Sequence, residues 1–76
     1  MTGSILQIAF DNIAQHISNI ERIRELVYEI DEEYDSIDEI IKSLEERLQD
    51  AEITLRTDIR ILINECRHLK IRTADK

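Results

Sequence analysis

The chain has 76 residues and a net charge of −7, with 42% hydrophobic and 36% charged residues. A chain this short forms at most one small domain and has little apolar surface to bury. It contains no proline and one glycine, and because tight turns recruit these residues, the composition argues against a turn-rich globular fold. The mixture favours a long helix with one apolar face.

The charge is distributed unevenly along the chain. Residues 21–52 contain thirteen acidic and four basic residues, whereas residues 53–76 contain three acidic and six basic residues. Because an acidic body repels phosphate, we expect no nucleic acid partner. No apolar run approaches the length of a membrane span, so we expect no membrane insertion. We expect the basic residues to complement the carbonyl end of a helix.

The amino-terminal residues 1–4, Met-Thr-Gly-Ser, are expected to be a flexible terminus or a cloning remnant. They lack the basic and apolar regions of a secretory signal, and the only cysteine, Cys66, has no second cysteine for an intramolecular disulfide. An intracellular protein is therefore expected. A helix is predicted over residues 5–71, followed by a flexible carboxyl-terminal tail over residues 72–76.

An apolar seam runs along the predicted helix. Between Ile23 and Leu55 its members are separated by alternating steps of four and three residues, which average the 3.5-residue heptad period. This period winds helices into a left-handed coiled coil. The sequence thus predicts an all-α fold, in which one long, nearly continuous amphipathic helix forms a coiled coil. The predicted interface residues are Phe10, Ile13, Ile17, Ile20, Ile23, Val27, Ile30, Tyr34, Ile37, Ile41, Leu44, Leu48, Ala51, Leu55, Ile59, Leu62, Cys66 and Leu69.

Two departures from the heptad period flank the regular stretch. Both steps from Ile17 through Ile20 to Ile23 are of three residues, and the steps on either side of Leu55 are both of four. Such changes overwind or unwind a coiled coil locally without breaking its helices. The seam is continuous across both positions, so we expect no interruption of the helix there.

A helical hairpin is the alternative to the continuous helix. Its corner would lie near residues 31–36, where Ser36 and Glu39 match a capping box, and hairpins would pair into a four-helix bundle. The heptad phase nevertheless runs through this corner from Ile30 to Ile37 without a shift. A continuous helix is therefore favoured.

The positions beside the seam indicate which partner helix would fit. One flanking column consists of Asp31, Asp38, Glu45 and Glu52, all of them acidic. In an antiparallel homodimer these acidic columns would face each other, so a parallel dimer of identical chains is favoured. A different coiled-coil protein with basic flanking residues would complement the column better. Exposed pairs of this kind are worth about 0.2–1 kcal/mol each, so they select between arrangements.

The apolar stripe is broader over residues 5–10 and 59–63, and Leu26 and Ile40 widen it between them. A two-stranded coiled coil would leave part of this surface in water, which suggests either a bundle at the ends or a second partner that docks there. We therefore expect an oligomerisation or scaffold segment of a larger protein or assembly that mediates protein–protein association. The alternative is a small acidic regulatory protein that binds a different partner through its broad apolar ends.

No arrangement of residues points to catalysis or to a cofactor. His16 and His68 lie 52 positions apart, and a continuous helix cannot bring them together. Cys66 and His68 are two positions apart and point to different faces of a helix, unlike the ligands of a metal site. Cys66 occupies the seam, where a small buried side chain is expected. We therefore expect no enzyme activity, no metal and no cofactor.

Overall fold

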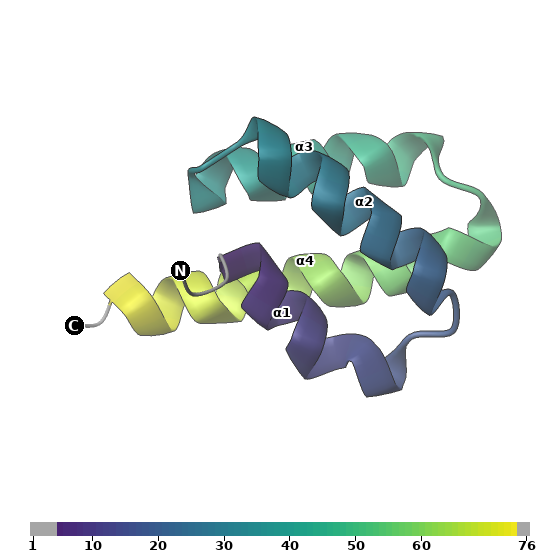
Figure 1. Ribbon diagram of the computed structural model, residues 1–76, viewed down its shortest axis with the longest axis horizontal. Coiled ribbons are helices and arrows are strands. Elements are labelled where there is room, and N and C mark those ends of the chain that lie inside the picture. Colours follow the sequence, from purple (N-terminus) through teal and green to yellow (C-terminus); the bar gives the residue numbers. More distant parts are fainter. Residues whose placement is uncertain (1–4, 75–76) are drawn as a thin grey trace.

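The computed structural model describes residues 5–74, and its regular structure there is entirely helical (Figure 1). The elements in chain order are α1 (Ile5–Ile13), a short 3-10 helix (Ala14–His16), α2 (Ile20–Glu33), α3 (Ile37–Asp50) and α4 (Ile53–Ala74). The all-α prediction is confirmed. Residues 1–4, expected to be a flexible terminus, lie outside the described residues, as do residues 75 and 76. The tail expected from residue 72 begins as helix, because α4 continues through Ala74.

The prediction of one long, nearly continuous helix is wrong. A helix over residues 5–71 would be roughly 100 Å long, whereas the longest dimension of the structure is 36 Å. Connections at residues 17–19, 34–36 and 51–52 interrupt the helix instead. The second connection lies at the corner that the hairpin alternative expected. One chain, rather than two paired hairpins, supplies the four α-helices of the described bundle.

The connections around α3 form without glycine or proline. Tyr34 after α2, Ser36 before α3 and Ala51 after α3 have extended backbone angles, which any residue can adopt. No non-glycine residue of the described chain has a positive φ. Ser36 is the N-cap residue of α3, but its side chain forms no capping hydrogen bond. The absence of glycine and proline there does not prevent the helices from being connected, because residues with ordinary extended angles form the connections.

Two of the three connections lie beside the departures from the heptad period. The connection at residues 17–19 falls within the two three-residue steps, and the connection at residues 51–52 comes shortly before Leu55. The expectation that the helix continues through both positions is wrong. Apolar residues on the two sides of each connection belong to different helices, so they do not need to share one helical phase.

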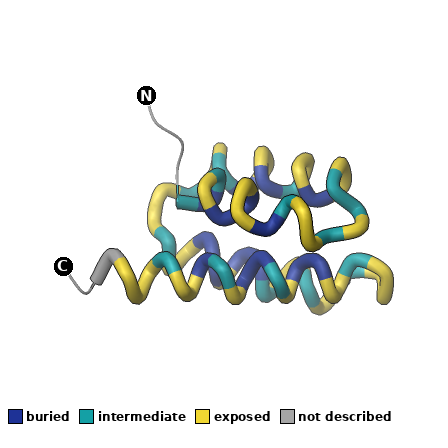
Figure 2. The backbone as a smooth tube through the Cα atoms, turned by 90° about the horizontal axis from the view of Figure 1, so that it is seen from below, coloured by how far each residue is buried: buried dark blue, intermediate teal, exposed yellow. Residues whose placement is uncertain are grey.

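The longest helix, α4, is at the centre of the packing. It packs extensively against both α1 and α3, and α2 packs against α1 and α3 (Figure 1). Each helix contributes to one core, and one fully buried residue from each helix illustrates this: Leu6, Ile30, Leu44 and Leu62. Figure 2 shows buried residues along the faces where the helices meet. Burial of a side chain of this size contributes about 1.5–3 kcal/mol, so the core is the main source of stability.

Ion pairs accompany the antiparallel packing of α3 and α4. Asp38 near the start of α3 pairs with Lys70 near the end of α4, and Glu45 in the middle of α3 pairs with Arg67. Asp38 and Glu45 belong to the acidic column that was expected to face a basic partner helix. These two residues meet basic residues of α4 in the same chain. The four side chains are 44–67% exposed, so each pair contributes little to stability and mainly favours this alignment.

Candidate functional site

The residues predicted to form an interface lie in the core of a single chain. All eighteen belong to the hydrophobic cluster or pack against it. The buried ones are Phe10, Ile13, Ile23, Val27, Ile30, Ile41, Leu44, Ile59, Leu62 and Cys66. The partly buried ones are Ile17, Ile20, Tyr34, Ile37, Leu48, Ala51, Leu55 and Leu69. The apolar seam therefore joins helices of one chain, and a second chain can reach only its partly buried members.

The two broad apolar stretches also face each other within the chain. One lies in α1 and the other in α4, and these two helices pack closely. Phe10 of α1 and Leu62 of α4 are both buried. The side-chain amide of Asn12 in α1 donates a hydrogen bond of 2.9 Å to Glu65 of α4. Most of the apolar surface that was expected to attract a partner is therefore covered by the chain itself.

Cys66 and the two histidines lie in different environments. Cys66 is fully buried, and burial raises the pKa of its thiol from 9.0 to about 12, with a smaller contribution from the negative charge of Glu65. His16 and His68 are exposed. Among the residues that the structure describes, no three or more His, Cys, Asp or Glu side chains are grouped to hold a metal ion. No helix in the described part of the chain has the length and hydropathy needed to span a bilayer.

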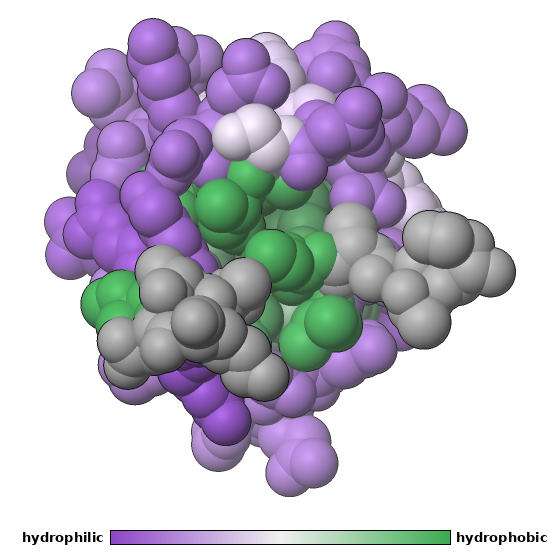
Figure 3. Space-filling model, turned by 90° about the vertical axis from the view of Figure 1, so that its left-hand side faces the viewer, coloured by the Kyte–Doolittle hydropathy of each residue, from purple (hydrophilic) through white to green (hydrophobic). Residues whose placement is uncertain are grey.

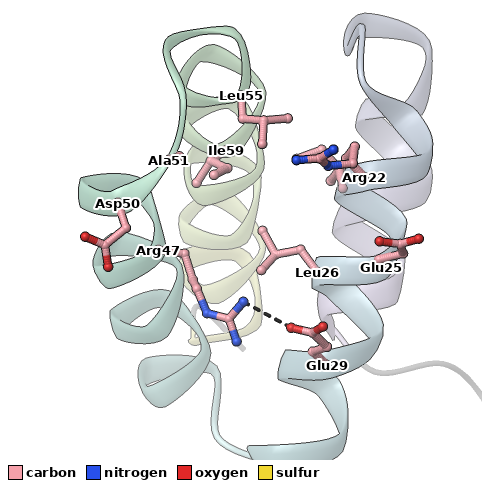
Figure 4. Close-up of a pocket in the computed structure, with 10 residues that line it drawn as sticks. Arg22, Glu25, Leu26, Glu29, Arg47, Asp50, Ala51, Leu55 and Ile59 are labelled. Carbon is pink, nitrogen blue, oxygen red and sulfur yellow. Dashed lines mark hydrogen bonds and ion pairs between the residues drawn. The ribbon is translucent and has the colours of Figure 1, made fainter.

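An open groove lies between α2 and the junction of α3 with α4 (Figure 4). We call it the α2–α4 groove, and its volume is about 260 Å³. Its apolar floor consists of Ile23, Leu26, Ala51, Leu55 and Ile59. Its charged rim consists of Arg22, Glu25, Glu29, Arg47 and Asp50. The groove thus combines an apolar floor with a rim of both charge signs.

Two leucines and one ion pair define the shape of the groove. Leu26 of α2 and Leu55 of α4 point into it from different helices (Figure 4), and both are only partly buried. Arg47 of α3 reaches across one end to Glu29 of α2, at an N–O distance of 3.1 Å. Their side chains are 43% and 63% exposed, so this pair is weak and can open at little cost in free energy. Apolar surface in the groove is therefore accessible to a second molecule.

The surface around the groove is acidic. Helices α2 and α3 together contain eleven acidic and four basic residues. Glu25 and Asp50 point away from the groove, on its two outer sides (Figure 4). An apolar segment with basic neighbours is complementary to such a surface.

Part of the groove was identified from the sequence. Half of its lining residues are apolar and the other half are charged. Four of its residues were predicted as interface residues, namely Ile23, Ala51, Leu55 and Ile59. Leu26 was noted for widening the apolar stripe, and this was the sequence signal for the groove. The charged residues of the rim were not identified, because the sequence does not distinguish them from other charged helix residues.

The fold and this groove define a small all-α bundle with an accessible apolar depression. The chain belongs to the MJ1579 family, whose family model matches residues 5–70. The matched region contains α1, α2, α3 and most of α4, and therefore every residue of the α2–α4 groove. No curated protein and no solved structure matches the chain.

Proposed function

We propose that the chain associates with proteins by binding an amphipathic helix in the α2–α4 groove. The helix would set an apolar side chain against Leu26 and Leu55, with its basic residues beside the acidic groups of α2 and α3. The observation that carries the proposal is the partial burial of these two leucines, which point into one groove from different helices. Protein–protein association is also the function expected from the sequence, although the groove shares only Ile23, Ala51, Leu55 and Ile59 with the predicted interface.

A helical ligand suits the groove for geometric reasons. A third helix laid over two others can insert its side chains between theirs, as helices generally do when they pack. Recognition of this kind uses apolar anchors three or four residues apart on one face of the bound helix. Leu26 and Leu55 point into the groove from different helices (Figure 4), so an apolar side chain of the ligand can be anchored between them.

Electrostatics favours a basic ligand helix. Residues 21–52, which include α3, nearly all of α2 and most of the groove, carry thirteen acidic and four basic residues. Basic flanks on the ligand would be attracted to this surface and would speed its association. Much of this attraction acts between exposed charges, so it should weaken as the ionic strength rises. An acidic helix with the same apolar face would be repelled.

A pair of synthetic peptides tests the proposal. Both form amphipathic helices with the same leucine face, and one carries lysines on its flanks where the other carries glutamates. Binding of the fluorescently labelled peptides to the full chain is measured by fluorescence anisotropy. We expect the lysine peptide to bind at least about tenfold more tightly than the glutamate peptide, a difference of about 1.4 kcal/mol. Added salt should reduce this difference.

A matched pair of variants locates the binding site. Leu26→Lys removes apolar surface from the groove and repels the lysine peptide, while lysine remains a good helix former. Tyr28→Lys makes the same charge change on the same helix, at a residue that is 57% exposed and does not line the groove. We expect Leu26→Lys to abolish binding and Tyr28→Lys to weaken it only slightly. Equal binding by the two folded variants would contradict the proposal.

A further inference from the structure

We propose that the helix bound in the α2–α4 groove is the carboxyl-terminal end of α4 from a second copy of this chain. We call residues 67–72 the α4 end. This inference rests on the proposed function, since it names the partner of the same groove. Three observations support it: the α4 end projects from the bundle, it has an apolar residue among basic ones, and it lies far from its own groove.

The α4 end extends beyond the neighbouring helices. Helix α4 has 22 residues, compared with 14 in α3, which runs antiparallel to it. Lys70 pairs with Asp38 near the start of α3, so the part of α4 that extends past α3 begins after Lys70. This last part of α4 projects from the bundle in two perpendicular views (Figures 1 and 2). A projecting helix end can enter a groove on another molecule without any rearrangement of the bundle.

The α4 end has the chemistry that the groove is proposed to bind. Ile71 is 62% exposed, and its neighbours in the chain are Lys70 and Arg72. Arg67 lies four residues earlier, and therefore on the same face of the helix as Ile71. Figure 3, which views the molecule from the side where α4 ends, shows an apolar area that is bordered in part by hydrophilic residues. An exposed isoleucine among basic side chains complements an apolar groove on an acidic surface.

The bound helix end has to come from another molecule. Leu55 in the groove and Ile71 in the α4 end lie sixteen positions apart on one helix, which separates them by about 24 Å. A continuous helix cannot fold back to bring its own end into its own groove. The two surfaces that meet are therefore different, and each added copy leaves one groove and one α4 end open. Such head-to-tail association builds chains or rings whose size increases with concentration.

The association is weak and rapidly reversible. A contact centred on one isoleucine and a few ion pairs is small compared with the roughly 1,200–2,000 Å² of stable interfaces. Lys70 and Arg67 also keep their exposed partners, Asp38 and Glu45, within their own chain. The assemblies should therefore appear at high protein concentration and low salt.

Sedimentation velocity of the full chain tests the inference. We expect the average sedimentation coefficient to rise from micromolar to millimolar concentration and the rise to disappear at high salt. Ile71→Glu and Leu26→Lys should each remain monomeric. An equimolar mixture of these two variants should form dimers and nothing larger. Ile71→Glu keeps an intact groove and Leu26→Lys keeps an intact α4 end, so only one contact can form between them. The controls Ile8→Glu and Tyr28→Lys change exposed residues of α1 and α2 and should assemble.

The possible failures are distinguishable. A wild-type chain that stays monomeric at millimolar concentration overturns the inference. If the lysine peptide still binds the groove of that monomeric chain, the proposed function stands and only the self-association is wrong. If the peptide does not bind either, the proposed function and the self-association are both wrong. A mixture of the two variants that forms no dimer also overturns the inference, because it shows that the two surfaces do not meet. Ile71 is exposed, so Ile71→Glu keeps the test valid even if Leu26→Lys fails to fold.

Discussion

The carboxylate of Asp58 in α4 accepts a hydrogen bond of 2.9 Å from the backbone N–H of Asn19, the residue before α2. It also accepts hydrogen bonds of 3.2 Å from the backbone N–H of Ser18 and from the side-chain amide of Asn19. Asp58 is only 3% exposed, and the side chain of Asn19 does not itself cap α2. Asp58 therefore ties the amino end of α2 to α4, and these helices carry the two leucines of the groove.

Removal of this carboxylate should destabilise the bundle. Asp58→Ala leaves the partly buried N–H groups of Ser18 and Asn19 without their acceptor. We expect the free energy of unfolding to fall by about 1–3 kcal/mol, measured by urea unfolding followed by circular dichroism. Asp58→Asn keeps the size of the side chain and one acceptor oxygen, so it should lower the free energy of unfolding by less than Asp58→Ala.

A surface carboxylate on α3 provides the matched control. Glu46→Ala removes the same formal charge from an exposed position and should change the free energy of unfolding by less than about 0.5 kcal/mol. Equal effects of Asp58→Ala and Glu46→Ala would show that the hydrogen bonds accepted by Asp58 do not stabilise the bundle.

The buried thiol of Cys66 should be unreactive in the folded chain. Its pKa of about 12, compared with the ordinary 9.0, lowers the fraction of reactive thiolate about a thousandfold near neutral pH. We expect iodoacetamide to modify Cys66 rapidly in urea and very slowly in native buffer, as followed by mass spectrometry. For the same reason, mild oxidation should not link two native chains. Rapid modification under native conditions would show that Cys66 is not in the core.

The same thiol should make stability fall at alkaline pH. In the unfolded chain it loses its proton near pH 9.0, but in the folded chain only near pH 12. Between these values the unfolded state binds fewer protons, so stability that is fully present below pH 9 is lost as the pH rises, by up to about 1.4 kcal/mol per unit. Cys66→Ala should lack this part of the decline. Parallel stability curves for the variant and the wild type would contradict the prediction.

The helical class and the core residues could be predicted, because a helix needs an apolar face whether it packs on another chain or on its own. Whether that apolar face packs on another chain or on the same chain could not be predicted. Over 14 residues, the length of α2 and of α3, the heptad period drifts by only about 20° per heptad from that of a straight helix. The phase that appeared to continue from Ile30 to Ile37 belongs to two separate helices. Spacing alone does not distinguish a coiled coil from a bundle of short helices.

The connections and the groove depend on tertiary structure. Tyr34 and Ser36 end and begin helices through ordinary extended angles, which leave no mark on composition. Folding back is favoured because the apolar seam of one segment then covers that of another. The groove depends on how α2 lies relative to α4, which no local pattern encodes. Leu26 gave the one usable signal, as an apolar residue beside a regular seam.

Truncation of a core residue separates an intrachain core from an intermolecular one. Leu62 is fully buried in α4, so Leu62→Ala should lower the free energy of unfolding by about 2–5 kcal/mol. Ile53→Ala, at a residue that is 81% exposed, should have little effect. At micromolar concentrations the melting temperature of the wild type should not depend on protein concentration, because one chain supplies the whole core. A strong rise with concentration would instead indicate a coiled coil between chains.

Mapping the lysine peptide onto the chain by nuclear magnetic resonance tests the groove most directly. The isotopically labelled protein is titrated with the unlabelled peptide, and the backbone amide signals are followed. We predict that the signals of Leu26, Ala51 and Leu55 shift, that those around Ile8 do not, and that the Leu26→Lys variant shows no such shifts. Shifts centred elsewhere on the bundle, or none at saturating peptide, would contradict the assignment of the α2–α4 groove as a helix-docking site.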